Sequence, residues 1–128
     1  MRHVNAPGAP KPGGPYSHAV VTGGLAFLAG QRPVDPVTGA IPSTVTEQAR
    51  QVLQNLGLVL EELGADLSAV VRTNVYLDDI GDFDAVNAVY REFFSEPFPA
   101  RTTVAVRLRG ILVEIDAVAE IPSPPESA

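Results

Sequence analysis

The sequence predicts a single α+β domain in which two helices cover one face of a mixed β-sheet. One long segment, Val45 to Leu63, has apolar residues at helical spacing, and short β-branched runs lie on both sides of it. The last such run, Ile111 to Ile121, alternates between apolar and more polar positions. We therefore expect the element order β-β-α-β-α-β-β, with the second face of the sheet in need of a cover.

The bulk composition limits the possible function classes. The 128 residues suit one domain, residues 1–128, and a net charge of −6 disfavours a nucleic-acid partner. The basic residues are scattered, and the only local cluster is Arg101, Arg107 and Arg109. The chain has no cysteine for disulfides or thiolate catalysis, and no apolar run of the ~18 residues that a membrane span needs. Because the first residues do not resemble a signal peptide, we expect a cytoplasmic location.

The first 31 residues predict an arm followed by a hairpin. Asn5 to Pro15 holds four prolines and three glycines, so residues 1–14 are expected to form an extended arm. Ser17 to Thr22 and Leu25 to Gln31 are predicted strands joined at Gly23-Gly24, a dipeptide suited to a tight turn. A similar Pro-rich composition at the other end predicts a flexible tail, residues 122–128.

The first predicted helix has signals at both ends. Thr44 and Glu47 form a candidate capping box, and Gly64 stands where a left-handed residue would end the helix. Val70 to Leu77 then predicts a strand.

A second helix is predicted between this strand and the next. Asp82 is its candidate N-cap, and Pro97 and Pro99 lie beyond its end. The expected inward face is Phe83, Val86, Tyr90 and either Phe93 or Phe94.

The last two predicted strands are Thr102 to Leu108 and Ile111 to Ile121. Only Arg109-Gly110 separates them, so we expect them to pair as a hairpin. On the final strand, one face is apolar and the other mixes aliphatic residues with acids. Such a mixed face predicts a subunit interface that contains a polar site.

Common catalytic motifs are missing from the sequence. It has no Gly-x-Ser-x-Gly elbow, phosphate-binding Gly-Lys-Ser/Thr loop, His-Glu-x-x-His or Gly-x-Gly-x-x-Gly. Ser17 and His18 are neighbours on a predicted strand and should point to opposite faces, so we expect His18 to be a near-surface strand residue. Two histidines disfavour a His-based metal centre, and we expect no metal, although Asp and Glu side chains could hold Mg²⁺ or Ca²⁺ weakly.

Arg101 is the residue whose position most needs an explanation. It begins an apolar, β-branched run, and a half-buried guanidinium requires an anionic partner. The partner is either the carboxylate of a small molecule or an internal acid, Glu114 or Asp116, and the spacing leaves both alternatives open. Taken alone, Glu114 could be a paired strand acid, and Tyr16 could be a packed aromatic residue.

Several motifs, in order along almost the whole chain, resemble the Rid/YjgF family of reactive-intermediate imine deaminases. They are NAPGAPKPGGPYSHAV, LAGQRPVDPVTGAIP, TEQARQVLQNL, VRTNVYLDDIGDFDAVNAVYREFF, FPARTTVAV and LVEIDAVA. The resemblance implies a chorismate-mutase-like fold and a homotrimer with sites in the clefts between subunits. It also implies a hydrolase that needs no cofactor and converts 2-aminoacrylate or 2-iminobutanoate to 2-keto acids and ammonia, which limits metabolite damage.

The resemblance also implies three catalytic residues. Arg101 matches the arginine that binds the substrate carboxylate, and Glu114 matches the acid that orients the attacking water. Tyr16 matches an aromatic residue that lines the site.

Four further positions correspond to substrate-binding residues of the family. Gly30 matches a backbone contact, and Asn87 matches a polar residue near the cleft. Thr103 would offer its backbone N–H where many members have Cys, and Ala29 replaces a common Ser. The segment Ser95 to Phe98 and the turn at 108–110 are shorter than in many relatives.

These departures leave other functions open. The chain could act on another substrate of the family, such as an aminomuconate-type enamine or a biosynthetic intermediate. It could also be a non-catalytic trimer that binds small carboxylates. Some relatives have been described as ribonucleases or translation inhibitors, which the net charge of −6 disfavours here.

Overall fold

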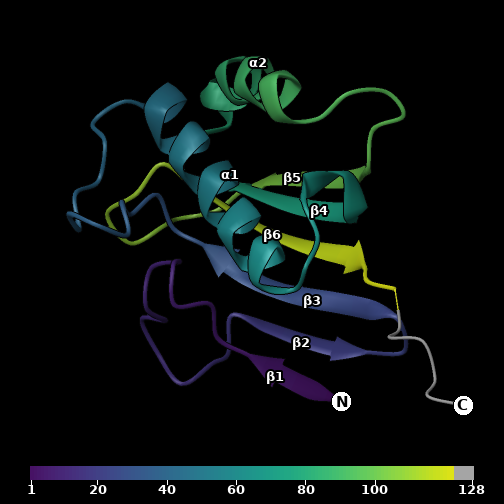
Figure 1. Cartoon of the computed structure of the whole chain (residues 1–128). Coiled ribbons are helices and arrows are strands. Elements are labelled where there is room, and N and C mark those ends of the chain that lie inside the picture. Colours follow the sequence, from purple (N-terminus) through teal and green to yellow (C-terminus); the bar gives the residue numbers. More distant parts are fainter. Residues whose placement is uncertain (123–128) are drawn as a thin grey trace, which may run out of the picture.

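The computed structural model describes residues 1–122 and confirms a mixed sheet with two helices on one face (Figure 1). The six strands lie in the order β1-β2-β3-β6-β4-β5. Their bounds are β1 (Arg2–Val4), β2 (Ala19–Thr22), β3 (Leu25–Gln31), β4 (Val70–Leu77), β5 (Ala100–Ala105) and β6 (Val113–Glu120). The helices are α1 (Val45–Glu62) and α2 (Phe83–Phe93), with short 3-10 turns η1 (Leu67–Ala69) and η2 (Ile80–Asp82). Apart from Pro122, the predicted tail lies outside the described residues.

Helix α1 begins and ends where its local signals predict. The Thr44 hydroxyl accepts a hydrogen bond from the Glu47 amide at 3.2 Å, while the Glu47 carboxylate pairs with Arg50. At the other end Gly64 has a φ of +75°, and the amides of Gly64 and Ala65 donate to carbonyls of the last turn. This is a Schellman motif, which satisfies backbone acceptors that the helix leaves unpaired.

Helix α2 differs from its prediction at its first residue. Asp82 precedes the helix but its side chain makes no capping bond, and Phe83 is 39% exposed rather than inward-facing. The Phe83 ring instead lies beside the Arg101 guanidinium, with the guanidinium carbon 5.4 Å from the ring centre. The residues that α2 and its C-cap bury are Val86, Val89, Tyr90 and Phe94.

The predicted hairpin between the last two strands is wrong. Strand β4 lies between β5 and β6, parallel to β5 and antiparallel to β6. The physical reason is the β4–α2–β5 crossover, because a helical connection returns the chain parallel to its starting strand. The following loop, residues 106–112, passes over the end of β4, where Asp78 N donates to Leu112 O at 3.1 Å.

The N-terminal arm packs against the domain, and two features of this contact were not predicted. Its first residues form β1, which pairs antiparallel with β2. His18 is buried, not near the surface as expected, since it is only 2% exposed. Its Nδ1 accepts from Ala6 N at 2.8 Å and its Nε2 donates to Pro10 O at 2.6 Å. These two bonds require the neutral Nε2–H tautomer and place the arm against β2 and β3.

The two faces of the sheet have the predicted difference in polarity. Alternate residues of β6, namely Val113, Ile115, Ala117 and Ala119, are buried under the helices. Glu114 and Asp116 point to the open face. No helix within residues 1–122 has the length and apolar character needed to cross a membrane.

Candidate functional site

The predicted catalytic residues lie on opposite faces of the sheet. Arg101 pairs in register with Thr73, which is buried under the helices, whereas Glu114 pairs with Tyr76 on the open face. Paired residues project to the same side of a sheet, so the Arg101 and Glu114 side chains point in opposite directions. Strand β4 also separates them, by two strand spacings or about 10 Å. The internal ion pair considered for Arg101 is therefore wrong.

Arg101 is held by side chains of α2. Its Nη2 donates to Asn87 Oδ1 at 2.5 Å, and its guanidinium lies 4.8 Å from the ring centre of Tyr90 and 5.4 Å from that of Phe83. The Tyr90 hydroxyl is in turn hydrogen-bonded to Thr73 Oγ1 at 2.9 Å. Aromatic faces attract a cation without neutralising its charge, so the guanidinium is positioned but keeps its positive charge.

Arg101 opens onto a hollow of about 270 Å³. The lining residues are Asn87, Tyr90, Arg91, Phe98, Pro99 and Arg101. Within residues 1–122, no carboxylate lies within 4.0 Å of the Arg101 guanidinium. The hollow can therefore accept a planar anion, which a guanidinium binds through two parallel hydrogen bonds.

Thr103 lies two residues after Arg101 on the same strand. Because β5 is the edge of the sheet, part of its backbone is not used for strand pairing. A backbone donor at this edge is about 7 Å along the strand from Arg101.

Glu114 sits beside an interruption in β3. The pairing register between β3 and β6 shifts between Leu28 and Gln31, so Ala29 and Gly30 lie in a bulge. A Cβ atom at Gly30 would be only 2.8 Å from Glu114 Oε2, closer than real contacts allow. Glycine at this position thus permits the close approach, because a side chain here would require the Glu114 carboxylate to move.

The two acids of the open face have different surroundings. Asp116 accepts hydrogen bonds from Asn74 Nδ2 at 2.8 Å and from the Tyr76 hydroxyl at 2.7 Å, and the latter bond helps to raise the pKa of Tyr76 to about 12. No residue among 1–122 donates a hydrogen bond to Glu114. Burial raises the pKa of Glu114, Arg32 opposes that shift, and Asp116 adds to it. Glu114 can therefore bind a water or a substrate proton, whereas Asp116 is already satisfied.

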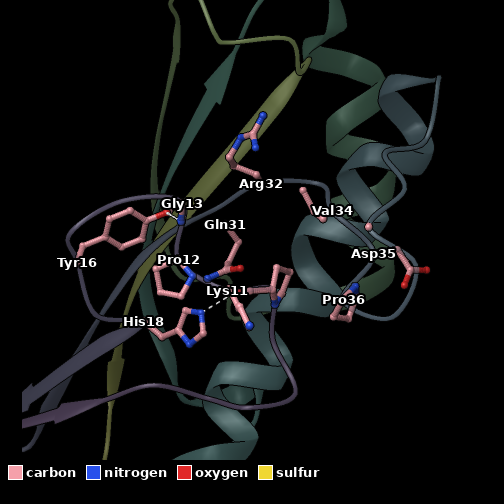
Figure 2. A pocket seen from close by; sticks show the side chains of 13 residues that line it. Lys11, Pro12, Gly13, Tyr16, His18, Gln31, Arg32, Val34, Asp35 and Pro36 are labelled. Carbon is pink, nitrogen blue, oxygen red and sulfur yellow. Dashed lines mark hydrogen bonds between the residues drawn. The ribbon is translucent and has the colours of Figure 1, made fainter.

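Tyr16 lies just after the arm and lines the hollow that also contains Glu114. Its hydroxyl accepts a hydrogen bond from Gly13 N at 3.0 Å, which leaves its own proton able to donate. Figure 2 shows Tyr16, Gly13 and Arg32 around the adjoining pocket under the arm. The structure thus brings Tyr16, Gly30 and Glu114 together, and separately brings Asn87 to Arg101.

Two buried amide side chains that position the site were missed in the sequence. Gln48 Oε1 accepts from Leu112 N at 2.8 Å, and Asn55 Nδ2 donates to Arg32 O at 3.0 Å. Gln48 and Asn55 are 4% and 0% exposed. The signal was available, because both interrupt the apolar stripe of the predicted helix, and a buried amide needs partners.

Comparison with known proteins assigns the chain to a family. The family described as Endoribonuclease L-PSP matches residues 6–121. A RutC family protein of Pyrococcus abyssi is 48% identical over 87% of this chain and 90% of its own length. The 2-iminobutanoate/2-iminopropanoate deaminase of Capra hircus is 42% identical over 92% of this chain and 88% of its own. The crystal structure of E. coli TdcF with bound serine superposes with a TM-score of 0.88 and 35% identity, covering 96% and 100% of the two chains.

Proposed function

The chain belongs to the Rid/YjgF family, whose matching description is Endoribonuclease L-PSP, and on that premise we propose that it is an imine deaminase. It hydrolyses enamine and imine acids such as 2-aminoacrylate and 2-iminobutanoate to 2-keto acids and ammonia. The strongest support is that two opposite charges are left without partners. Within residues 1–122, Arg101 is held in place but has no acid partner, and Glu114 accepts no hydrogen bond. The similarity to the goat deaminase and to the serine-bound E. coli protein favours a small amino-acid-like substrate.

The proposed site lies between two subunits of a homotrimer. A four-carbon substrate is too short to reach from Arg101 to Glu114 through the sheet of one chain. In the assembly, Arg101 of one subunit would face Glu114 and Tyr16 of its neighbour. The open face supports this arrangement, because apolar side chains such as Phe27 and Val104 are 46% and 41% exposed there.

The chemistry needs no strong nucleophile. Arg101 binds the carboxylate, and the Thr103 amide offers a second donor at the strand edge. Protonation of the imine nitrogen makes the adjacent carbon electrophilic. Glu114 then takes a proton from a water as the C–O bond forms, and the resulting carbinolamine expels ammonia as its C–N bond breaks, leaving the 2-keto acid. General acid–base assistance of this kind contributes about 10²- to 10⁴-fold.

A coupled assay tests the proposal. A threonine dehydratase generates 2-iminobutanoate, semicarbazide traps it, and the trapped product is followed with wild type, Arg101→Ala and the control Arg50→Ala. Arg50 pairs with Glu47 and Glu92 on the helices, away from the site. Wild type and the Arg50 variant should lower the trapped imine, and the Arg101 variant should lose at least about 10² in kcat/KM.

Mixing two inactive variants tests the subunit arrangement. In trimers assembled from equal amounts of Arg101→Ala and Glu114→Ala chains, about one quarter of the sites should contain both intact residues. Activity near that level supports a site shared by two chains. Complete inactivity of mixed trimers, with each variant folded, would contradict it.

The family description gives a second candidate, ribonuclease activity. A chain with a net charge of −6 repels RNA phosphates unless its basic residues act together. Cleavage of a labelled RNA by wild type but not by Glu114→Ala would favour this candidate over the deaminase.

A further inference from the structure

Three arginines surround the hollow that contains Glu114. Arg32, Arg107 and Arg109 line this hollow of about 440 Å³, together with Gly13, Tyr16, Leu108, Ile111 and Glu114. They are three of the nine Lys and Arg residues of a chain whose net charge is −6. None forms an ion pair within 4.0 Å with an acid of residues 1–122. With one acid and three arginines among its lining residues, the hollow has an excess of positive charge.

The sequence could not reveal this cluster. Arg101 was expected to belong with Arg107 and Arg109, but it faces the opposite side of the sheet. Arg32 takes its place, although it is 77 residues from Arg109 in the chain. The Arg32 Nη2 donates to the Arg109 carbonyl at 3.1 Å, which links the two loops directly.

Side-chain hydrogen bonds hold the backbone on both sides of the hollow. Asn55, which is fully buried in α1, donates to the carbonyls of Arg32 and Val34 at 3.0 and 2.9 Å. Across the hollow, Leu108 N donates to Asp78 Oδ1 at 2.8 Å. The arginine-bearing loops are therefore ordered before any ligand binds, which lowers the entropic cost of binding.

We propose that this hollow binds a second anionic group of the substrate, a carboxylate or a phosphate, while Arg101 of the adjacent subunit binds the α-carboxylate. Guanidinium groups match both anions in geometry, and several in one hollow concentrate the positive potential. Leu108 and Ile111 provide apolar wall for the carbons between the two anionic ends. The preferred substrates are then dianionic imine acids. This inference rests on the proposed function, because that function places the reacting carbon of the substrate beside Glu114.

Binding of stable 2-keto acids tests the inference without turnover. The probes are 2-oxobutanoate with one anionic group, 2-oxoglutarate with a second carboxylate, and 3-phosphohydroxypyruvate with a phosphate. In calorimetry, at least one of the two dianions should bind wild type at least about tenfold more tightly than 2-oxobutanoate. The comparison of the two dianions identifies which anionic group the hollow prefers.

Variants assign the preference to the arginines. In Arg32→Met with Arg109→Met, the affinity ratio of dianion to monoanion should fall to near one, and in Arg109→Lys it should be intermediate, since the charge remains but the planar fork is lost. Arg50→Met is the matched control and should keep the wild-type ratio. Melting curves confirm that each variant is folded.

Turnover separates this inference from the proposed function. The imines of 2-aminobutanoate and glutamate, generated by amino-acid oxidases, are compared in the semicarbazide assay. Hydrolysis of both at equal kcat/KM, with a keto-acid affinity ratio near one in wild type, would overturn the dianion site and leave the deaminase standing. Arginine-dependent binding of dianions without hydrolysis of any imine would support the anion site and refute the deaminase.

Discussion

Arg101 and Glu114 are positioned by two different kinds of structure. Side chains of one helix, α2, hold Arg101: Asn87 Oδ1 accepts a hydrogen bond from its guanidinium, and the rings of Phe83 and Tyr90 lie against it. Glu114 is instead set by backbone, because the β3 bulge at Gly30 allows its close approach and the arm and loops enclose it. We therefore expect the Arg101 position to tolerate single changes around it, because several side chains hold it, and the Glu114 position to depend more on the neighbouring backbone.

The neighbouring acids sharpen this comparison within one strand. Asp116 accepts hydrogen bonds from two side chains and is a structural group on the open face. Glu114, two residues earlier, is half-buried with a raised pKa and no donor among residues 1–122. A half-buried acid with a raised pKa and no hydrogen-bond donor is typical of a functional position.

The largest predicted effect is that of Glu114→Gln. Imine hydrolysis should fall by about 10²- to 10⁴-fold, because the amide cannot take a proton from water. Stability should not fall with it. The folded-state pKa of Glu114 is raised above its ordinary 4.5, so the wild type loses stability as the pH rises through that folded pKa. Denaturant unfolding should show the variant at least as stable as wild type at pH 7, and this advantage should vanish near pH 4.

Glu120→Gln, at the exposed end of the same strand, is the control for that experiment. It should change neither activity nor the pH dependence. A Glu114→Gln variant that is clearly less stable than wild type at pH 7 would mean that the carboxylate is a structural group like Asp116.

An intermediate effect is predicted for Gly30→Ala. The added Cβ would lie 2.8 Å from Glu114 Oε2 and must displace the carboxylate. A misplacement of this size should lower kcat/KM in the imine assay by about 10- to 100-fold.

Gly57→Ala is the matched control, since a Cβ at this position in α1 meets no atom within 4 Å. It should leave activity intact and raise the free energy of unfolding by about 0.5–1 kcal/mol. Equal activity of the two alanine variants would show that Glu114 does not need its present position.

The smallest effect is predicted for Asn87→Ala in the other half of the site. It removes one hydrogen bond from Arg101, but the Tyr90 and Phe83 rings remain. KM should rise about three- to tenfold with little change in kcat, because the guanidinium acts in substrate binding. Asn87→Asp tests the same point, since its carboxylate would compete with that of the substrate and raise KM further. A fall in kcat at constant KM would contradict a pure binding role.

The sequence by itself determined the elements whose signals are local. The limits of α1 and β4, the Thr44 cap and the Gly64 terminus depend on hydrogen bonds within a few residues and on apolar periodicity, so they could be predicted. Arg101 could be selected as a candidate site residue for the same reason, because an arginine at the start of an apolar strand is conspicuous in its local pattern. The roles of Glu114 and Gly30 came from the resemblance to the family.

Only the tertiary structure decided how these elements meet. The place of β4 between β5 and β6 separated Arg101 from Glu114, the folded-back arm buried His18, and the contact of Arg32 with Arg109 joined residues 77 positions apart. Each outcome depends on which strand fills the free side of β4 or which loop packs over it. The spacing of residues along the chain cannot predict the strand order or the loop packing, because the competing arrangements satisfy the same backbone hydrogen bonds and differ only in long-range packing.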